Sequence, residues 1–454
     1  MDEEHSYTGN WWLPSNPSFR LPGKLTFTRR LGLKLELHGN FGKPAEVDPR
    51  GVMILGEDSF GEAITLYQAL FSEGITPGID PSRGTSSFVA NKAFVGCHFA
   101  NREEATFSAV AYRPTHLDEW LRLPSIDIDW KLPRFSATYN PPSRLEFPAG
   151  PGLTIAVAFS STGPGLSKSL NILSFEQHAW FVLRKDQPAH WNSFGEDLSH
   201  LNNLASLAVM APIHPLEVEA FLPRENNAPL TDPTTRVKVL LPLYRDPTEE
   251  DRRFFDMLFT YNHVADRLGT LLQNWFSKRD TLEPVFDLFF AATYNPYSSP
   301  VQTFLNYVQA LETYHIRTRP NDIDPPDIHK NRLKALLHAA PAEFRQWLGE
   351  KLAFSNSPTL AQRLKDLVDA NPQLVTGMAG SHEHFINRVK NSRHYYTHYN
   401  PSRKEEAESG GRLRGLSMVL GSMLEAFLLI EAGFELAETR ELQRNRRSLP
   451  QAWL

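Results

Sequence analysis

The stretch Val389-Lys-Asn-Ser-Arg-His-Tyr-Tyr-Thr-His-Tyr-Asn-Pro401 carries more usable chemistry than any other part of the chain. One arginine, two histidines and three tyrosines stand within ten residues. On a helix, His394 and His398 share a face because they are four residues apart. An arginine can hold a phosphate, and a histidine can move a proton near neutral pH. The rest of the sequence is easiest to interpret as the scaffold of this stretch.

Length and charge limit what that scaffold can be. A chain of 454 residues exceeds the size at which one hydrophobic core keeps growing, so two or three domains are expected. The net charge of −5 gives no overall basic field of the kind that drives non-specific binding of nucleic acids. Any RNA or DNA site must therefore be local.

Cysteine content and hydropathy predict the compartment. Cys97 is the only cysteine and cannot form an internal disulfide. The start Met1-Asp-Glu-Glu4 is acidic, whereas a signal peptide begins with positive charge. The most apolar segment, 416–437, is interrupted by three glutamates and lacks an uncharged run of about 20 residues. We expect a cytoplasmic protein without a membrane anchor.

The first part of the chain has the pattern of β-strands. In Leu31–His38 every second residue is apolar, which predicts a half-buried strand. Leu198–Met210 is predicted as a single helix, and Val237–Leu241 as the last strand of this part. The other predicted strands are Leu25–Thr28, Val52–Leu55, Ile64–Leu70, Phe88–Phe99, Phe107–Tyr112, Leu153–Phe159 and Trp180–Leu183.

After residue 247 the apolar spacing becomes helical, with acidic residues in the first turn. The predicted helices cover residues 249–276, 282–293, 299–316, 327–338, 341–352, 358–370, 380–397 and 411–442. The last of them is apolar on nearly every face, which suits a helix buried in a bundle or against a second copy of the chain. The sequence thus predicts an α+β protein, with a β-rich domain over 1–245 and an all-α region over 246–454.

Spacing alone does not identify Arg393 and His398 as a pair. Arg184 with His190, Arg332 with His338 and Arg388 with His394 have similar separations. The residues around Arg393 and His398 decide whether the two form a functional pair. The octapeptide Arg-His-Tyr-Tyr-Thr-His-Tyr-Asn stands late in the helical region, Asn400-Pro401 discourages continuation of the helix, and a long apolar helix follows.

These residues resemble the HEPN ribonuclease family, and most closely its ApeA-type anti-phage branch. The resemblance continues in Phe304–His315, Trp347-Leu348, Leu360–Lys365 and Leu416–Phe434, which places the HEPN core at about 299–442. The β-rich region is similar to the ApeA amino-terminal domain in Gly9–Pro14, Pro22–Leu25, Leu33–Gly39 and Ala63–Leu66.

The resemblance implies a metal-independent endoribonuclease that works as a symmetric dimer and uses no cofactor. A ribose 2′-hydroxyl attacks the adjacent phosphate of cellular RNA, tRNA included, once phage infection is detected through a phage-derived trigger. The β-rich domain would sense the infection or control access to the cleft.

Geometry points to the same assembly. Five residues separate Arg393 and His398, which turns them about 140° apart on a helix. A two-fold axis would bring both residues of both copies into one cleft. We expect His398 to act as general base or acid, Arg393 to neutralise the phosphoryl oxygens, and His394 to orient the phosphate.

Supporting roles are expected for five further residues. Glu312 and His315 are three residues apart on a predicted helix and can line the same cleft. The Glu312 carboxylate could orient Arg393 or a histidine. A solvated salt bridge is the alternative for Glu312. Asn391, Thr397 and Tyr399 complete the predicted site.

Other interpretations stay open at this point. The motif residues can be ordinary residues of a helix end. His394 and His398, with His382 and His384 nearby, have a spacing that could bind a metal ion, but no HExxH pattern supports that reading. The helical domain could also be a non-catalytic dimeric module that binds a nucleotide, RNA or a protein partner. A basic carboxyl-terminal tail, with Arg440, Arg444, Arg446 and Arg447, could reach RNA phosphates or be solvated.

Overall fold

The computed structural model describes residues 4–41, 51–75, 84–131, 134–166, 173–223, 235–243, 252–295, 297–374 and 381–445. The chain forms two compact units. The β-rich unit comprises residues 1–205, 213–254 and 259–273, and the helical unit comprises 206–212, 255–258 and 274–454. An α+β protein with a β-rich amino-terminal part and a helical carboxyl-terminal part was predicted, and this is confirmed. Residues 244–251, where the domain boundary is predicted, lie outside the described residues.

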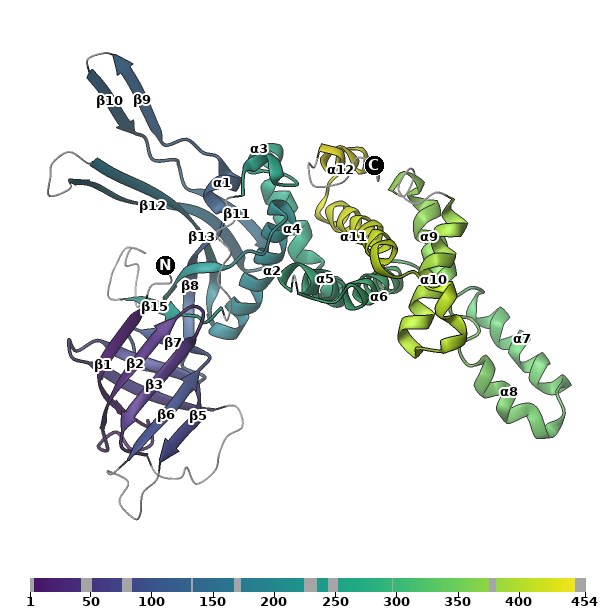
Figure 1. Ribbon diagram of the computed structural model, residues 1–454, viewed down its shortest axis with the longest axis horizontal. Coiled ribbons are helices and arrows are strands. Elements are labelled where there is room, and N and C mark those ends of the chain that lie inside the picture. The colour runs from purple at the N-terminus through teal and green to yellow at the C-terminus, as the bar shows by residue number, and fades with distance from the viewer. Residues whose placement is uncertain are drawn as a thin grey trace. The chain divides into compact units, whose positions relative to one another are not determined.

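The β-rich unit is built on one 13-stranded sheet, ordered β11-β12-β13-β8-β14-β15-β7-β5-β4-β1-β2-β3-β6 (Figure 1). A separate two-stranded ribbon joins β9 to β10. The strands are β1 His5–Trp12, β2 Leu21–Thr28, β3 Gly32–His38, β4 Val52–Asp58, β5 Ala63–Ile75, β6 Thr85–Ala90, β7 Lys92–Val95, β8 Thr106–Pro114, β9 Ile126–Lys131, β10 Arg134–Tyr139, β11 Leu145–Gly150, β12 Leu153–Leu166, β13 Leu173–His190, β14 Pro215–Phe221 and β15 Arg236–Leu240.

Six of these strands close into a barrel. Because β6 pairs with both β3 and β5, the series β5-β4-β1-β2-β3-β6 has no free edge. Alternate residues of β3 point inward, so that Leu33, Leu35 and Leu37 are buried in its core. Gly56 lies opposite Trp11 in the register, and a Cβ atom there would stand 2.3 Å from the indole ring. The barrel closes around that tryptophan only because residue 56 is a glycine.

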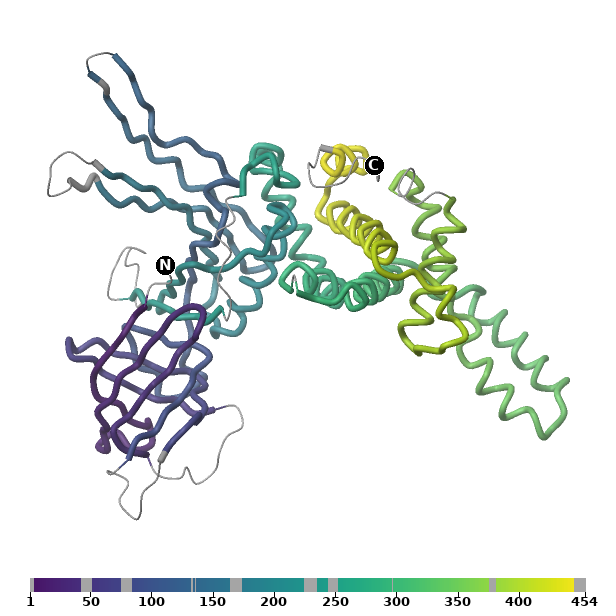
Figure 2. The backbone as a smooth tube through the Cα atoms, in the orientation of Figure 1, coloured from purple at the N-terminus to yellow at the C-terminus, as the bar shows by residue number. Residues whose placement is uncertain are grey.

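The remaining strands support helix α2, Trp191–Val209, and carry long ribbons. The hydroxyl of Tyr112 on β8 donates to Oδ1 of Asn202 on α2 at 2.9 Å, which ties the helix to the sheet. Figure 2 shows the β9–β10 ribbon and the far ends of β12 and β13 projecting from the body of this unit. Every described side chain of β9 is exposed. A short helix, α1 Leu117–Leu121, precedes β9.

The single cysteine is half-buried in the β-rich unit. Thr65 donates from Oγ1 to the carbonyl oxygen of Cys97 at 2.9 Å and accepts the amide of Phe99 at 3.0 Å. Burial raises the pKa of the Cys97 thiol to about 12. The thiol is therefore protonated near neutral pH.

Helices form most of the described part of the chain after β15. They are α3 Tyr261–Val264, α4 Leu268–Ser277, α5 Arg279–Tyr294, α6 Pro300–Thr318, α7 Pro326–Ala339, α8 Arg345–Leu352, α9 Leu360–Ala370, α10 His382–His398, α11 Gly410–Ala432 and α12 Leu436–Asn445. The short 3-10 helices are η2 Phe254–Asp256, η3 Ala342–Phe344, η4 Pro372–Leu374 and η5 Pro401–Glu406. In the helical unit α11 packs along α6, and the α7–α8 pair projects away from α10 (Figure 1).

Three predicted elements are each divided in the structure. The segment Phe88–Phe99 contains two strands, β6 and β7, separated at Asn91. The predicted helix 249–276 is η2, α3 and α4 in its described part, because the chain restarts at Thr260 with a capping box to His263. The predicted helix 411–442 is α11 and α12, because Gly433 adopts φ +104° and ends α11.

Helix α11 is the core of the helical unit. Its length and composition would suffice to cross a membrane, but 72% of its most apolar window is buried inside the protein. Residues 422–429 are all buried, so this half of the helix is covered on every face. Such burial explains an apolar helix by packing alone.

Candidate active site

Helix α10 positions the motif. Ser381 caps its first turn, where the serine hydroxyl accepts the amide of His384 at 3.3 Å. Phe385, Ile386, Val389 and Ser392 form its buried face. From residue 393 onward the described side chains are half-buried or exposed. The last turns of α10 therefore present their side chains outward while its first turns anchor the helix.

The helix ends where the sequence predicts. Tyr399 adopts φ +49° and closes the last turn, and Pro401 opens η5 directly afterwards. A proline cannot continue the helix because it lacks the backbone N–H. Arg393 and His398 are thus both helical, and their five-residue separation turns them to different directions.

The two histidines of the motif stand side by side, as their spacing predicts. Their ring centroids are 5.1 Å apart with an interplanar angle of 57°. His394 is half-buried and His398 is exposed. No hydrogen bond or ion pair joins Arg393 to His398 in the described part of the chain. The structure thus brings His394 and His398 together, whereas Arg393 and His398 leave the helix in different directions.

Positive charge gathers around His394. Desolvation lowers the pKa of its imidazole, and the charges of Arg403, His398 and Arg393 lower it further against the opposing effect of Glu406. The ring is therefore largely neutral near pH 7. An anion bound beside His394 would be attracted by the two arginines.

The tyrosines form a cluster at the helix end. Tyr395, Tyr396 and Tyr399 have ring centroids 5.0 to 6.1 Å apart. Tyr396 also meets the ring of Phe304 on α6 at 6.3 Å. The cluster joins the motif to α6, while Tyr399 keeps 59% of its surface exposed.

Two further predicted residues have local roles in the structure. The hydroxyl of Thr397 donates to the carbonyl oxygen of Arg393 at 2.7 Å, within the same helix. Asn391 is half-buried on α10. The Thr397 side chain is exposed, next to His398 in the sequence.

Glu408 is a central residue of the site that the sequence did not reveal. Its carboxylate binds Arg388 Nε at 2.7 Å and Arg412 Nε at 3.1 Å. Its amide donates to Ser392 Oγ at 3.0 Å, and its carbonyl oxygen accepts the Tyr396 hydroxyl at 2.8 Å. Through these contacts Glu408 fixes the segment after the motif against α10. The only sequence signal was its place among charged residues, which does not distinguish it from a solvated turn.

Comparison with known families decides the assignment. Residues 6–275 match the family model for ApeA N-terminal domain 1, and residues 305–438 match the model for Apea-like HEPN. The chain belongs to the ApeA-type HEPN family. The match to the HEPN model supports the assignment of the chain as a HEPN-type defence protein. Comparison with curated proteins and with solved structures gives no match.

Within the HEPN domain, His315 takes a structural position. The side chain is 3% exposed, with Nδ1 3.0 Å from Arg363 Nη1 and Nε2 3.3 Å from Asp366 Oδ2. Because a guanidinium can only donate, Nδ1 is the acceptor and Nε2–H donates to Asp366. Burial and the charge of Arg363 lower the pKa of His315 against the opposing effect of Asp366. His315 joins α6 to α9, and these contacts do not include the motif.

Glu312 is half-buried on α6. In the described part of the HEPN domain no ion pair links it to Arg393, His394 or His398. The described residues also hold no group of three His, Cys, Asp or Glu side chains placed to bind a metal ion. Of the basic tail, Arg446 and Arg447 lie outside the described residues, and Arg440 and Arg444 belong to α12.

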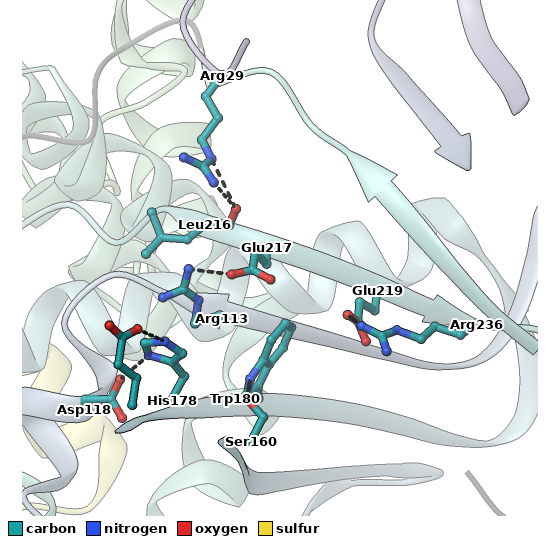
Figure 3. A network of polar contacts seen from close by, with 11 residues as sticks. Arg29, Arg113, Asp118, Ser160, His178, Trp180, Leu216, Glu217, Glu219 and Arg236 are labelled. Carbon is teal, nitrogen blue, oxygen red and sulfur yellow. Dashed lines mark hydrogen bonds and ion pairs between the residues drawn. The ribbon is translucent and has the colours of Figure 1, made fainter. Parts of the chain in front are cut away.

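The ApeA N-terminal domain has a polar surface of its own (Figure 3). Arg113 pairs with Glu217 at 2.5 Å, and Arg236 pairs with Glu219. Arg29 donates two hydrogen bonds to the carbonyl oxygen of Leu216 at 2.9 and 3.2 Å. A cavity of about 330 Å³ lies beside these residues. The two ion pairs join neighbouring strands, and Arg29 binds a backbone carbonyl of β14, so contacts within the domain explain this surface.

Proposed function

We propose that this protein is a metal-independent HEPN endoribonuclease that cleaves cellular RNA, tRNA included, in anti-phage defence. The arrangement of α10 carries the proposal. It presents Arg393 and the His394–His398 pair at an outward-facing helix end, without a carboxylate paired to Arg393 in the described residues. An arginine without an ion-pair partner can bind an anionic substrate, and a histidine near it can transfer a proton of that substrate.

The proposed reaction begins with the ribose 2′-hydroxyl. A general base removes its proton as the 2′-oxygen forms a bond to the adjacent phosphorus atom. The bond from phosphorus to the 5′-oxygen then breaks, and a general acid protonates that oxygen. The products are a 2′,3′-cyclic phosphate and a 5′-hydroxyl end, so no water is consumed and no metal ion is required.

Each motif residue has a proposed role in this reaction. His398 transfers the proton, because its exposed imidazole can reach a bound ribose and imidazoles change charge near neutral pH. The Arg393 guanidinium neutralises charge on the two non-bridging oxygens. His394 orients the phosphate, and Asn391, Thr397 and Tyr399 shape the surrounding surface. Glu312 and His315 act on the site from α6, His315 through the packing of that helix.

The proposed active form is a homodimer. The 140° or so between Arg393 and His398 disfavours the convergence of both side chains of one helix on one phosphate. A two-fold axis at the end of α10 would supply the missing group from a second copy. We further propose that the protein is cytoplasmic, that residues 246–454 form the nuclease region, and that residues 1–245 respond to a phage-derived trigger.

RNA cleavage in the presence of EDTA tests the proposal. Arg393→Ala and His398→Ala should each abolish cleavage, with losses of about 10²-fold or more for a lost proton-transfer group. His384→Ala is the matched control, since His384 is an exposed histidine at the other end of the same helix. We expect it to cleave like the parent protein and to leave 2′,3′-cyclic phosphate ends.

Two results would overturn the nuclease. Cleavage by His398→Ala at the parental rate would remove the proposed proton transfer. RNA that binds but is never cut, even in cells exposed to phage, would favour the non-catalytic module instead. A protein that remains monomeric while it cuts RNA would overturn the composite cleft alone.

A further inference from the structure

A cavity of about 500 Å³ lies within the helical unit. Most of its lining residues come from α5, α6 and α11, and α6 packs against both of the other helices (Figure 1). None of these lining residues belongs to the stretch 389–401 that carries the motif. Pockets that bind small molecules commonly have volumes of about 300–1,000 Å³. The cavity is therefore large enough for a small organic ligand and is separate from the candidate active site.

The face of α11 that borders the cavity differs from the rest of this leucine-rich helix. It carries Arg414, Ser417, Gly421, Ser422 and Glu425, and spacings of three and four residues keep them on one face. Arg414 and Glu425 are eleven residues apart, which is about 16 Å along a helix that rises about 1.5 Å per residue. This face thus has a cation at one end and a carboxylate at the other.

Several polar groups that line the cavity lack a partner among the described residues. Ser422 is 8% exposed, and its hydroxyl makes no hydrogen bond within the described part of the chain. The same holds there for the hydroxyls of Thr293 on α5 and Thr303 on α6, and the exposed Arg414 guanidinium makes no ion pair with a described residue. Because buried polar groups are normally hydrogen-bonded, the Ser422 hydroxyl in particular indicates a polar occupant.

Two aromatic rings add a flat apolar surface to the lining. Phe289 on α5 and Tyr307 on α6 have ring centroids 5.9 Å apart with an interplanar angle of 32°. A Cβ atom at Gly421 would lie 3.0 Å from the Tyr307 ring, so a small residue at 421 lets this ring keep its place. Aromatic side chains pack favourably against the flat ring of a ligand.

We propose that this cavity binds a nucleoside monophosphate. A guanidinium binds phosphate oxygens through charge-assisted hydrogen bonds, and one arginine suits one phosphate group. The hydroxyls of Thr293, Thr303 and Ser422 can donate to and accept from the hydroxyls of a ribose. The rings of Phe289 and Tyr307 offer a surface to the base.

The two ends of the α11 face set the orientation of the nucleotide. The phosphate lies at the Arg414 end, because a phosphate is repelled by a carboxylate and attracted by a guanidinium. The base points toward Glu425, whose Oε1 accepts Gln443 Nε2 at 2.9 Å. A carboxylate can accept several donors at once, so an N–H group of the base can share it with Gln443.

Isothermal titration calorimetry on the whole chain tests the site without RNA. The probes are AMP, CMP, GMP and UMP, and then the nucleoside of the tightest-binding of the four. The parent protein should bind the monophosphate about 10-fold or more tightly than the nucleoside, since hydrogen bonds to a charged group contribute at least that factor. Arg414→Gln should abolish this preference and leave the affinity for the nucleoside unchanged.

A second variant tests the hydroxyls. Thr303→Val keeps the shape of the side chain and should weaken binding of the nucleotide and of the nucleoside alike, by about 2- to 12-fold for one lost hydrogen bond. Arg317→Gln is the matched control for charge, because Arg317 is an exposed arginine of α6 that does not line the cavity. Its affinities should equal those of the parent protein. Thermal unfolding without ligand verifies that each variant is folded.

The outcomes decide the proposal independently of the nuclease. Absence of saturable binding of all four monophosphates to the folded parent protein overturns the proposal and assigns the cavity to water. Retention of the preference for the monophosphate in Arg414→Gln, or an equal loss in Arg317→Gln, overturns the phosphate position. Neither result affects the proposed cleavage, in which no residue that lines the cavity takes part.

Discussion

Replacement of Ser392 by alanine should release the segment after the motif. Ser392 is 0% exposed, and its hydroxyl accepts the Glu408 amide at 3.0 Å. Alanine removes the acceptor and leaves a partly buried N–H without its partner, which costs about 1–3 kcal/mol. The contacts of Glu408 with Tyr396 and Arg388 remain, so we expect local opening and not loss of the fold.

Hydrogen exchange at the Glu408 amide measures this opening. A cost of about 1–3 kcal/mol corresponds to exchange about 5- to 150-fold faster, since about 1.4 kcal/mol is a factor of ten. Ser417→Ala is the matched control. Ser417 is 6% exposed, and its hydroxyl donates to Leu413 of its own helix at 2.9 Å, so its removal leaves no backbone group unpaired. Equal protection of Glu408 in both variants would refute the role given to Ser392.

Two other predictions concern pH and the end of α11. RNA binding should tighten as the pH falls below about 6.5, because the lowered pKa leaves His394 neutral in the free protein and a bound phosphate favours its protonation. In binding titrations, His394→Ala should flatten this pH dependence. A pH dependence in that variant equal to that of the parent protein would contradict the prediction. Gly433→Ala should destabilise the helical unit by about 2–3 kcal/mol in chemical denaturation, because alanine is strained at φ +104° and its Cβ would lie 2.7 Å from Asn274 Nδ2. Gly410→Ala, with φ +55° and no atom within 4 Å, carries the strain without the contact, and equal losses in the two variants would show that Asn274 contributes nothing.

Local patterns predicted much of the fold. Alternation in Leu33, Leu35 and Leu37 predicted a half-buried strand, which is β3, and Asn400-Pro401 predicted the end of the motif helix. Closure of the barrel could not be predicted, because it depends on β6 pairing with β3, from which it is separated in sequence by β4 and β5. The sequence predicted one long helix where the apolar pattern continues but the backbone does not, because the positive φ of Gly433 ends α11.

For the candidate site, too, some features could be predicted from the sequence and others could not. The neighbourhood of His394 and His398 followed from their spacing, because both lie on one helix. The partners of His315 did not, since Arg363 and Asp366 come from another helix and become neighbours only through packing. Glu408 joins the site through a fold of the chain that no periodicity encodes.

The environment of Cys97 makes the chain suited to site-directed spin labelling. A thiol with a pKa of about 12 has almost no thiolate at neutral pH and reacts slowly with maleimides or methanethiosulfonates. A cysteine introduced at an exposed position, such as Glu383 at the start of α10, would be labelled selectively in the otherwise natural sequence. The distance between nitroxides on two protomers could then be measured by pulsed electron resonance, with and without RNA.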